Sequence, residues 1–123
     1  MRLIKEARYL FLDRDGVINR RLVGDYVKCQ DEFEFLEGNL EAFEIFNRLF
    51  DKIVVVTNQQ GIGKGLMSEN DLEQVHSYMK KEIEQCGGRI DAVFHCPSLA
   101  KENSIDRKPN VGMGLKARKL FKE

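Results

Sequence analysis

The sequence predicts an α/β protein built on a parallel β-sheet, and three observations carry this prediction. Short apolar runs alternate with longer stretches whose apolar residues recur every three or four positions, the order expected for strands alternating with helices. The apolar runs are continuous, as in strands buried on both faces of a parallel sheet. The first two runs stop directly at polar residues. We expect core strands near residues 7–12, 52–57 and 90–95, flanked by helices.

The first strand, Tyr9–Leu12, ends at two aspartates that bracket an arginine. Ligands of open α/β sheets bind beyond the carboxyl ends of the strands, so Asp13 and Asp15 lie where chemistry is expected. Side chains two residues apart on an extended segment point the same way, which predicts that the two carboxylates converge and that Arg14 points elsewhere. A polar turn after a strand is the alternative, because Asp and Gly are common turn residues.

The next helix and strand follow the same logic. Residues 39–50 predict a helix with one buried face, because their apolar residues recur at three- and four-residue spacing. The β-branched run Ile53–Val56 predicts a second buried strand, which ends at Thr57 and Asn58. Seen alone, these two polar residues are a strand-end cap.

Two loops are candidates for ligand contact. Residues 20–31 have the mixed polarity of a short flap, with Tyr26 and Val27 as contacts for a ligand or for the core. Gly61–Gly65 resembles a nucleotide loop only superficially, because Lys64 is followed by glycine rather than Ser or Thr. We expect a flexible turn whose backbone approaches the ligand closely.

The second half of the chain continues the alternation. Ser68 and Asp71 predict a capping pair for a helix over residues 69–86, which two glycines end. Residues 90–95 predict the third strand. A weaker helix is expected over residues 111–122, because two glycines lower its propensity. This order implies right-handed crossovers between parallel strands.

The composition suits a single soluble domain over residues 1–123. Twenty Lys and Arg balance twenty Asp and Glu, so no global field directs the chain toward nucleic acid or a membrane surface. The apolar runs are far shorter than a membrane span, and the first residues lack the apolar centre of a secretory signal. Three cysteines without CxxC spacing favour reduced thiols. We expect a cytoplasmic protein.

The polar residues at the strand ends and the basic pair Arg107-Lys108 are suited to binding and hydrolysing a phosphate ester. Hydrolysis of a phosphate monoester needs a nucleophile, a proton donor and cations that offset charge. Asp13 would attack phosphorus and form an aspartyl-phosphate, and Asp15 would protonate the leaving oxygen and later deprotonate the hydrolytic water. The Thr57 hydroxyl and the backbone N–H groups after it would hold the phosphoryl oxygens. Lys108 would neutralise charge, although Arg107-Lys108 seen alone is a solvated basic pair.

Three segments, Phe11–Asn19 (FLDRDGVIN), Val55–Gln59 (VVTNQ) and Arg107–Pro109 (RKP), occur in the order of the motifs of a known family. Through them the chain resembles the haloacid dehalogenase (HAD) superfamily of aspartyl-phosphate phosphatases. The residues in these three motifs most resemble those of the small histidinol-phosphate and heptose-bisphosphate phosphatase branch. A chain that resembles this branch is expected to be a phosphatase, a hydrolase that acts on phosphoric monoesters.

The resemblance implies a Rossmann-like, three-layer α/β/α fold and a small phosphorylated substrate such as a heptose bisphosphate or histidinol phosphate. It implies that Asn19, Asn58 and Arg107 contact the phosphate or the rest of the substrate. It also implies Mg²⁺ bound by the Asp13 carboxylate and the Asp15 backbone carbonyl. No organic cofactor is expected.

The chain departs from this branch in the loop before the third motif. Relatives hold a structural zinc there with paired Cys and His ligands, whereas the matching positions here are Cys96, Ser98, Ser104 and Asp106. One thiol cannot close a tetrahedral site, so no structural zinc is expected. His95 is interpreted as a strand-end histidine rather than a ligand.

The family's fourth motif, aspartates after a further strand, is not found in the sequence. We therefore expect a C-terminally incomplete fold, weaker Mg²⁺ binding, and a first strand at a sheet edge, which is usually protected. A truncated gene product, a proteolytic fragment and a homodimer covering this edge remain open as explanations.

Two other classes of protein share parts of this pattern. A response-regulator receiver also combines a parallel sheet, an acid pair, a Thr and a Lys, but its phosphate-accepting aspartate follows the third strand, where this chain has His95-Cys96-Pro97. A catalytically impaired relic that binds phosphate or a partner without turnover is the stronger alternative.

Overall fold

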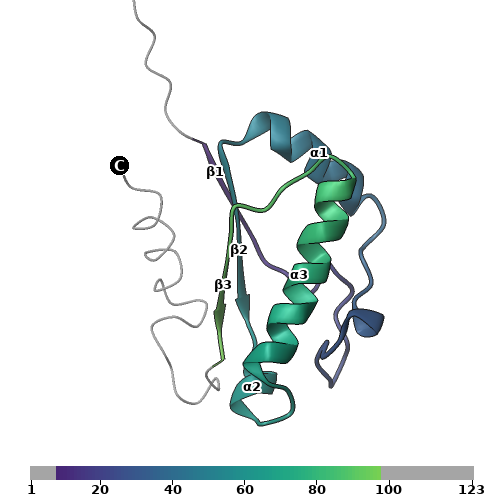
Figure 1. Ribbon diagram of the computed structural model, residues 1–123, viewed down its shortest axis with the longest axis vertical. Coiled ribbons are helices and arrows are strands. Elements are labelled where there is room, and N and C mark those ends of the chain that lie inside the picture. The colour runs from purple at the N-terminus through teal and green to yellow at the C-terminus, as the bar shows by residue number, and fades with distance from the viewer. Residues whose placement is uncertain (1–7, 98–123) are drawn as a thin grey trace, which may run out of the picture.

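The computed structural model describes residues 8–97 as strands that alternate with helices (Figure 1). In chain order, the elements are β1 (Tyr9–Leu12), the 3-10 helix η1 (Gln30–Glu32), α1 (Asn39–Leu49), β2 (Lys52–Asn58), α2 (Gln60–Gly63), α3 (Glu69–Gln85) and β3 (Ala92–Cys96).

The strands form one parallel sheet in the order β1-β2-β3. Leu12 pairs with Val55, and Thr57 pairs with His95, so the carboxyl ends of all three strands lie at the same end of the sheet. Figure 1 shows α1 and α3 on the same face of this sheet, as expected when both helices connect neighbouring parallel strands in the same direction. The predicted α/β fold with a parallel sheet and flanking helices is confirmed.

Two expectations about the rest of the sheet have different outcomes. The helix expected over residues 111–122 lies outside the described residues, and the three-layer α/β/α arrangement stays a prediction. Within residues 8–97, β1 is an end strand of the sheet. The expectation that this strand stays at an edge in the whole chain, or is covered by a homodimer, stays a prediction. The third strand begins at Ala92 rather than at Ile90, because Asp91 bonds to Ile53 through both its backbone N–H and its carboxylate.

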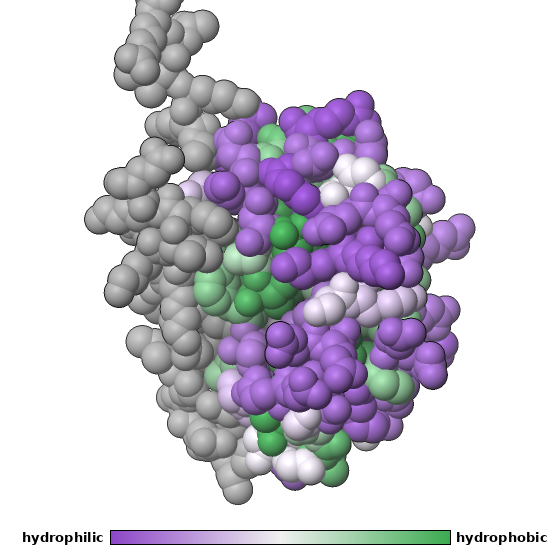
Figure 2. Space-filling view, viewed as in Figure 1, coloured by the Kyte–Doolittle hydropathy of each residue, from purple (hydrophilic) through white to green (hydrophobic). Residues whose placement is uncertain are grey.

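Alternation along β2 divides the apolar core between the two faces of the sheet. Ile53 and Val55 pack in the main cluster, under the helices, while Val54 packs with Ala92 in a second cluster. The helices contribute to the main cluster the buried residues Phe43, Val75, Met79 and Ile83. Figure 2 shows the outer surface of the described residues, which is hydrophilic over the helices and apolar along the strands. No helix in the described part of the chain combines the length and the hydrophobicity needed to cross a bilayer.

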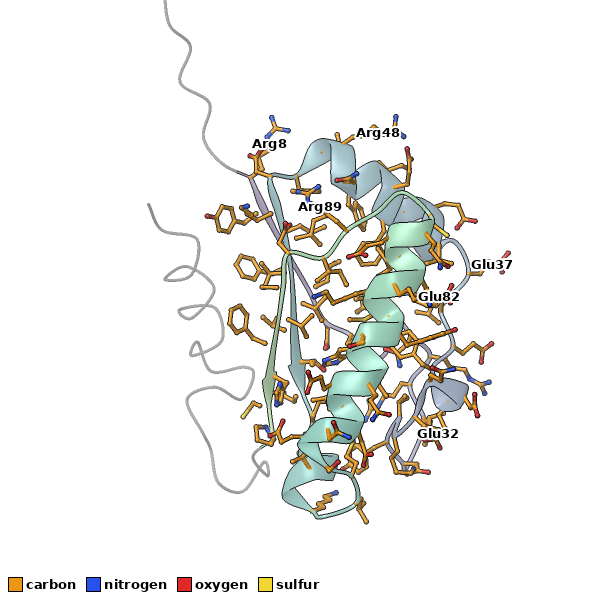
Figure 3. All side chains as sticks on the ribbon, viewed as in Figure 1. Arg8, Glu32, Glu37, Arg48, Glu82 and Arg89 are labelled. Atoms are coloured by element: carbon orange, nitrogen blue, oxygen red, sulfur yellow. The ribbon has the colours of Figure 1, made fainter. Side chains whose placement is uncertain are left out.

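Arg89 joins α1 to the start of β3, at the end of the sheet away from α2 (Figure 3). Its guanidinium donates to the carbonyls of Phe50 and Asp51 at 2.6 and 2.8 Å and pairs with the carboxylate of Asp91. These bonds satisfy carbonyls that follow the end of a helix. Arg89 is therefore a structural residue at the amino end of β3, far from the carboxyl ends of the strands.

The predicted capping pair at the start of α3 is confirmed. The Ser68 hydroxyl accepts the Asp71 N–H at 3.0 Å, and the Asp71 carboxylate accepts the Ser68 N–H at 2.9 Å. We expect Ser68→Ala to lower the free energy of unfolding by about 1 kcal/mol, because one N–H at the helix start loses its acceptor. Urea denaturation measures this change. Ser77→Ala, in the middle of the same helix, is the control and should not lower stability.

Candidate active site

A cavity of about 420 Å³ opens at the carboxyl ends of β1 and β2, which is within the range of small-molecule sites. Both aspartates of the first motif reach it. Its lining consists of Asp13, Asp15, Arg21, Leu22, Gly24, Asp25, Tyr26, Val27, Asn58, Gln60, Lys64 and Leu66. The predicted convergence of two carboxylates on one site is present, and residues 21–27 of the expected flap form much of the wall.

A tight loop after β1 sets the position of the second aspartate. The Arg14 amide donates to the Asp13 carboxylate at 2.8 Å, and the Gly16 amide donates to the Asn19 carbonyl at 2.8 Å. Gly16 has φ of 86°, a left-handed conformation that favours glycine. The loop thus folds back on itself and brings Asp15 beside Asp13 at the cavity.

Both carboxylate oxygens of Asp15 are held by neighbouring side chains. Oδ1 accepts Arg14 Nη2 at 2.7 Å and Asn19 Nδ2 at 3.0 Å, and Oδ2 accepts Gln59 Nε2 at 3.0 Å. Burial raises the pKa of Asp15, but the Arg14 charge and these hydrogen bonds together outweigh it and leave the pKa below its ordinary value of 3.8. Asp15 is therefore ionised at neutral pH.

The polar residues at the end of β2 take different places. Thr57 is 1% exposed, and its Oγ1 accepts Gln59 Nε2 at 2.8 Å. It is not among the residues that line the cavity, so its contact with a phosphate stays a prediction. Asn58 lines the cavity directly. Asn58 therefore shares the cavity with the acid pair, whereas Thr57 is linked to Asp15 through the Gln59 amide.

Asn19, Arg107 and Lys108 were also singled out in the sequence as contacts of the phosphate or the substrate. Asn19 is fully buried and donates to Asp15 and to the Arg20 carbonyl, so its amide supports the acid; its contact with a substrate stays a prediction. Arg107 and Lys108 lie outside the described residues. Their expected approach to the phosphate also stays a prediction.

The prediction that Arg14 points away from the acid pair is wrong. Its guanidinium is buried and turns back to bond Asp15. The alternation rule assumed an extended backbone, but β1 ends at Leu12 and the chain bends directly afterwards. Gln59 is the second residue that the sequence interpretation missed. Its place two residues after Thr57, at a strand end, was the available signal.

The glycine-rich segment after β2 also differs from expectation. Residues 60–63 form the short helix α2 rather than a flexible turn. A Cβ at Gly61 would lie 2.9 Å from Tyr26 Cγ and 3.2 Å from Met67 Sδ. The close approach that glycine permits is therefore to the flap residue Tyr26, not to a ligand. The Lys64 ammonium lies 5.3 Å from the centre of the same ring.

The acid pair has the donor chemistry that Mg²⁺ requires. Mg²⁺ sites in proteins commonly use one or two carboxylates, with waters and phosphate oxygens completing the octahedron. Asp13 and Asp15 line one cavity, and the Asp13 carboxylate fits this pattern. Both carboxylate oxygens of Asp15 accept hydrogen bonds from neighbouring side chains, and its binding of Mg²⁺ through the backbone carbonyl stays a prediction. Within residues 8–97, no three His, Cys, Asp or Glu side chains gather as a metal-binding group.

The positions considered for zinc are only partly described. Cys96 is buried at the end of β3, and Ser98, Ser104 and Asp106 lie outside the described residues. The expected absence of zinc stays a prediction. His95 lies in β3 with its Nε2 2.6 Å from a carboxylate oxygen of Glu69.

His76 on α3 is expected to make stability depend on pH. Burial and the neighbouring Arg14 charge lower its pKa from 6.5 to about 3. The unfolded chain therefore binds a proton below pH 6.5 that the folded chain excludes, so stability is fully present above pH 6.5 and is lost as the pH falls toward 3. At pH 5 the loss is about 2 kcal/mol.

Urea denaturation at pH 7 and pH 5 measures this loss, and His76→Gln should remove it. His95→Gln is the matched control and should retain most of it, because burial and the Arg14 charge lower the pKa of His76 more than the His95 charge does. An equal loss in His76→Gln would show that another group is responsible. The lowered pKa of Asp15 affects stability only below its ordinary value of 3.8, outside this range.

Known proteins are similar to this chain in both sequence and fold. The chain is 44% identical over 106 residues to the D-glycero-alpha-D-manno-heptose-1,7-bisphosphate 7-phosphatase of Mycobacterium tuberculosis, a match to 86% of this chain and 56% of that protein. It is 34% identical over 118 residues to the D-glycero-beta-D-manno-heptose-1,7-bisphosphate 7-phosphatase of Helicobacter pylori strain J99, covering 95% and 67% of the two chains. No family model matches the chain.

The solved structure of D,D-heptose 1,7-bisphosphate phosphatase from B. bronchiseptica, in complex with magnesium and phosphate, superposes with a TM-score of 0.86 at 33% identity. The match covers 94% of this chain and 64% of that one. Parallel sheet, acid-tipped first strand and cavity together define the class of the HAD-like phosphatases. The chain belongs to the heptose-1,7-bisphosphate 7-phosphatase family of that class, and it spans a little over half the length of the M. tuberculosis relative.

Proposed function

We propose that the protein is a Mg²⁺-dependent phosphomonoester hydrolase that acts on a phosphorylated sugar, with heptose 1,7-bisphosphate as the first candidate. The observation that carries the proposal is the pair Asp13 and Asp15 in one cavity beyond the strand ends. The relatives support the substrate class, since their names specify the 7-phosphate of a heptose bisphosphate. They differ in the α or β form of the sugar, so both forms are candidates.

In the first chemical step, a carboxylate oxygen of Asp13 attacks phosphorus as the bond from phosphorus to the sugar oxygen breaks. Asp15 donates a proton to that leaving oxygen. In the second step, water attacks the aspartyl-phosphate, Asp15 takes a proton from this water, and orthophosphate leaves as the Asp13 carboxylate is restored. Atoms and charge balance over the cycle, because Asp15 gives one proton and regains one.

Asp15 must be protonated before it can act as the acid, but in the protein without substrate its carboxyl group is ionised. The Arg14 charge and the surrounding hydrogen bonds lower the pKa of Asp15 against the opposing effect of burial. A phosphate dianion entering the cavity adds negative charge beside the carboxylate, which raises the pKa. Substrate binding therefore favours protonation of Asp15, and the free protein holds the base form used in the second step.

Other residues would bind the substrate. The Thr57 hydroxyl proton and the Asn58 amide are donors for the phosphoryl oxygens, and bound Mg²⁺ would neutralise charge on them. Arg21 and Lys64 line the same cavity and supply cationic groups for a second phosphate on the sugar. We propose Lys108 as a further cation at the transferring phosphate.

The decisive experiment measures orthophosphate release by the full chain. The substrates are both forms of heptose 1,7-bisphosphate, histidinol phosphate and a set of sugar monophosphates, each with Mg²⁺ and with EDTA. We expect Mg²⁺-dependent release, fastest with a heptose bisphosphate. Binding of orthophosphate in calorimetry without turnover of any substrate would contradict the enzyme and support the alternative, a catalytically impaired phosphate-binding module.

A further inference from the structure

A buried arginine between the two aspartates links the candidate acid to helix α3. The Arg14 guanidinium is 0% exposed and has contacts on three sides. Nη2 donates to Asp15 Oδ1 at 2.7 Å, Nη1 lies 3.1 Å from His76 Nε2, and the guanidinium carbon lies 5.8 Å from the centre of the Phe33 ring. A buried guanidinium is costly unless its N–H groups have acceptors, and Arg14 Nε is buried without one in the part of the chain that the structure describes, so the two Nη contacts determine where the guanidinium lies.

The His76 contact fixes the form of the imidazole ring. Arginine has only donors on its guanidinium, so His76 Nε2 must be the acceptor and the ring proton must be on Nδ1. The lowered pKa of His76 agrees with a neutral ring at neutral pH. The histidine therefore presents a lone pair to Arg14 and is not a proton donor to the acid.

We propose that His76 is a positioning residue for Asp15 and acts through Arg14. The proposal rests on the proposed function, because that function assigns the acid and base steps to Asp15. Without an acceptor on α3, one buried N–H of Arg14 loses its partner, and the guanidinium rearranges to recover one. The Asp15 oxygen bonded to Arg14 then changes orientation relative to Asp13, and a small misplacement of a catalytic group is enough to slow a reaction.

A purely structural role for His76 predicts something different. It would lower stability when lost but would leave the turnover of the folded protein unchanged. Val75 is the neighbouring buried residue on α3 and belongs to the main core cluster. The contacts of the Arg14 guanidinium given above, with Asp15, His76 and Phe33, do not involve Val75. Val75→Ala therefore serves as a variant that is destabilised without disturbing the Asp15–Arg14–His76 chain.

The kinetic test compares His76→Leu with His76→Gln. Glutamine carries its amide oxygen near the position of Nε2 and restores an acceptor, whereas leucine fills the space without one. We expect His76→Leu to lower kcat about 10-fold with KM changed less than about 2-fold, and His76→Gln to recover kcat to within about 3-fold of the parent. If His76→Leu lowers kcat no more than Val75→Ala does, the proposal is overturned.

A spectroscopic test at constant neutral pH requires no turnover. Nitrogen-15 NMR of the His76 ring should show a protonated Nδ1 and an unprotonated Nε2. The Gln59 side-chain amide, which donates to Asp15 Oδ2, should shift in His76→Leu and keep its position in His76→Gln and Val75→Ala. An unchanged Gln59 resonance in His76→Leu overturns the proposal even if the parent protein is active. If the parent releases no phosphate, the proposed function fails, and this resonance decides whether His76 positions Asp15.

Discussion

Asp13→Asn is expected to abolish phosphate release from an aryl phosphate in the presence of Mg²⁺, with a loss of at least about 10³-fold in kcat. Asparagine preserves the shape of the side chain and can still accept the Arg14 N–H that bonds the Asp13 carboxylate. It cannot, however, form the aspartyl-phosphate, because its amide is a poor nucleophile. The loss therefore tests covalent catalysis by Asp13 separately from the integrity of the fold.

A matched substitution makes this result specific. Asp31 lies on η1, is exposed and does not line the cavity, so Asp31→Asn makes the same chemical change away from the site. We expect its kcat to equal that of the parent, and we expect both variants to retain the parental circular dichroism spectrum. Substantial turnover by Asp13→Asn would assign the nucleophile to another group and would contradict the proposed mechanism.

Phe43→Ala is expected to have the largest effect on stability, about 3–5 kcal/mol. Phe43 is fully buried under the sheet, and its ring lies 5.7 Å from that of Phe46 in an edge-to-face arrangement. Its β-carbon is also packed tightly, because a Cβ at Gly88 would lie 2.8 Å from it. Removing the ring leaves a cavity that these neighbours fill only in part. The loss is a large share of the total stability of a domain, which is on the order of 5–15 kcal/mol.

Urea denaturation with a constant m-value measures the effect of Phe43→Ala. Leu49→Ala, on the same helix, is the control, because Leu49 is 51% exposed and its truncation removes less buried area. We expect it to cost less than about 1 kcal/mol. Similar losses in the two variants would show that Phe43 is not held in a packed core.

The order of elements could be predicted from the sequence because each depends on local signals. The apolar run of β2, the spacing of apolar residues in α1 and the Ser68–Asp71 capping box are all confirmed within one or two residues. These features follow from burial and backbone hydrogen bonding along a short segment. The position of the acid pair could be predicted for the same reason, since it follows directly from the end of β1.

The connections between distant residues could not be predicted. Arg14 meets His76, 62 positions later in the chain, and Gln59 meets Asp15 across 44 positions. No periodicity encodes such pairs, because they depend on how the loop after β1 bends and on which turn of α3 lies against it. The role of Gly61 was misassigned for the same reason, since the ring of Tyr26 that it accommodates comes from a different loop.

The buried ion pair of Arg14 and Asp15 affects how mutagenesis of the site must be interpreted. In the described part of the chain, Asp15 is the one anion paired with this enclosed cation. Asp15→Asn would therefore leave a positive charge without its counter-ion inside the protein, which is costly in itself. Lost activity in that variant would combine a missing proton donor with a weakened fold, whereas the same exchange at Asp13 keeps the two causes separate.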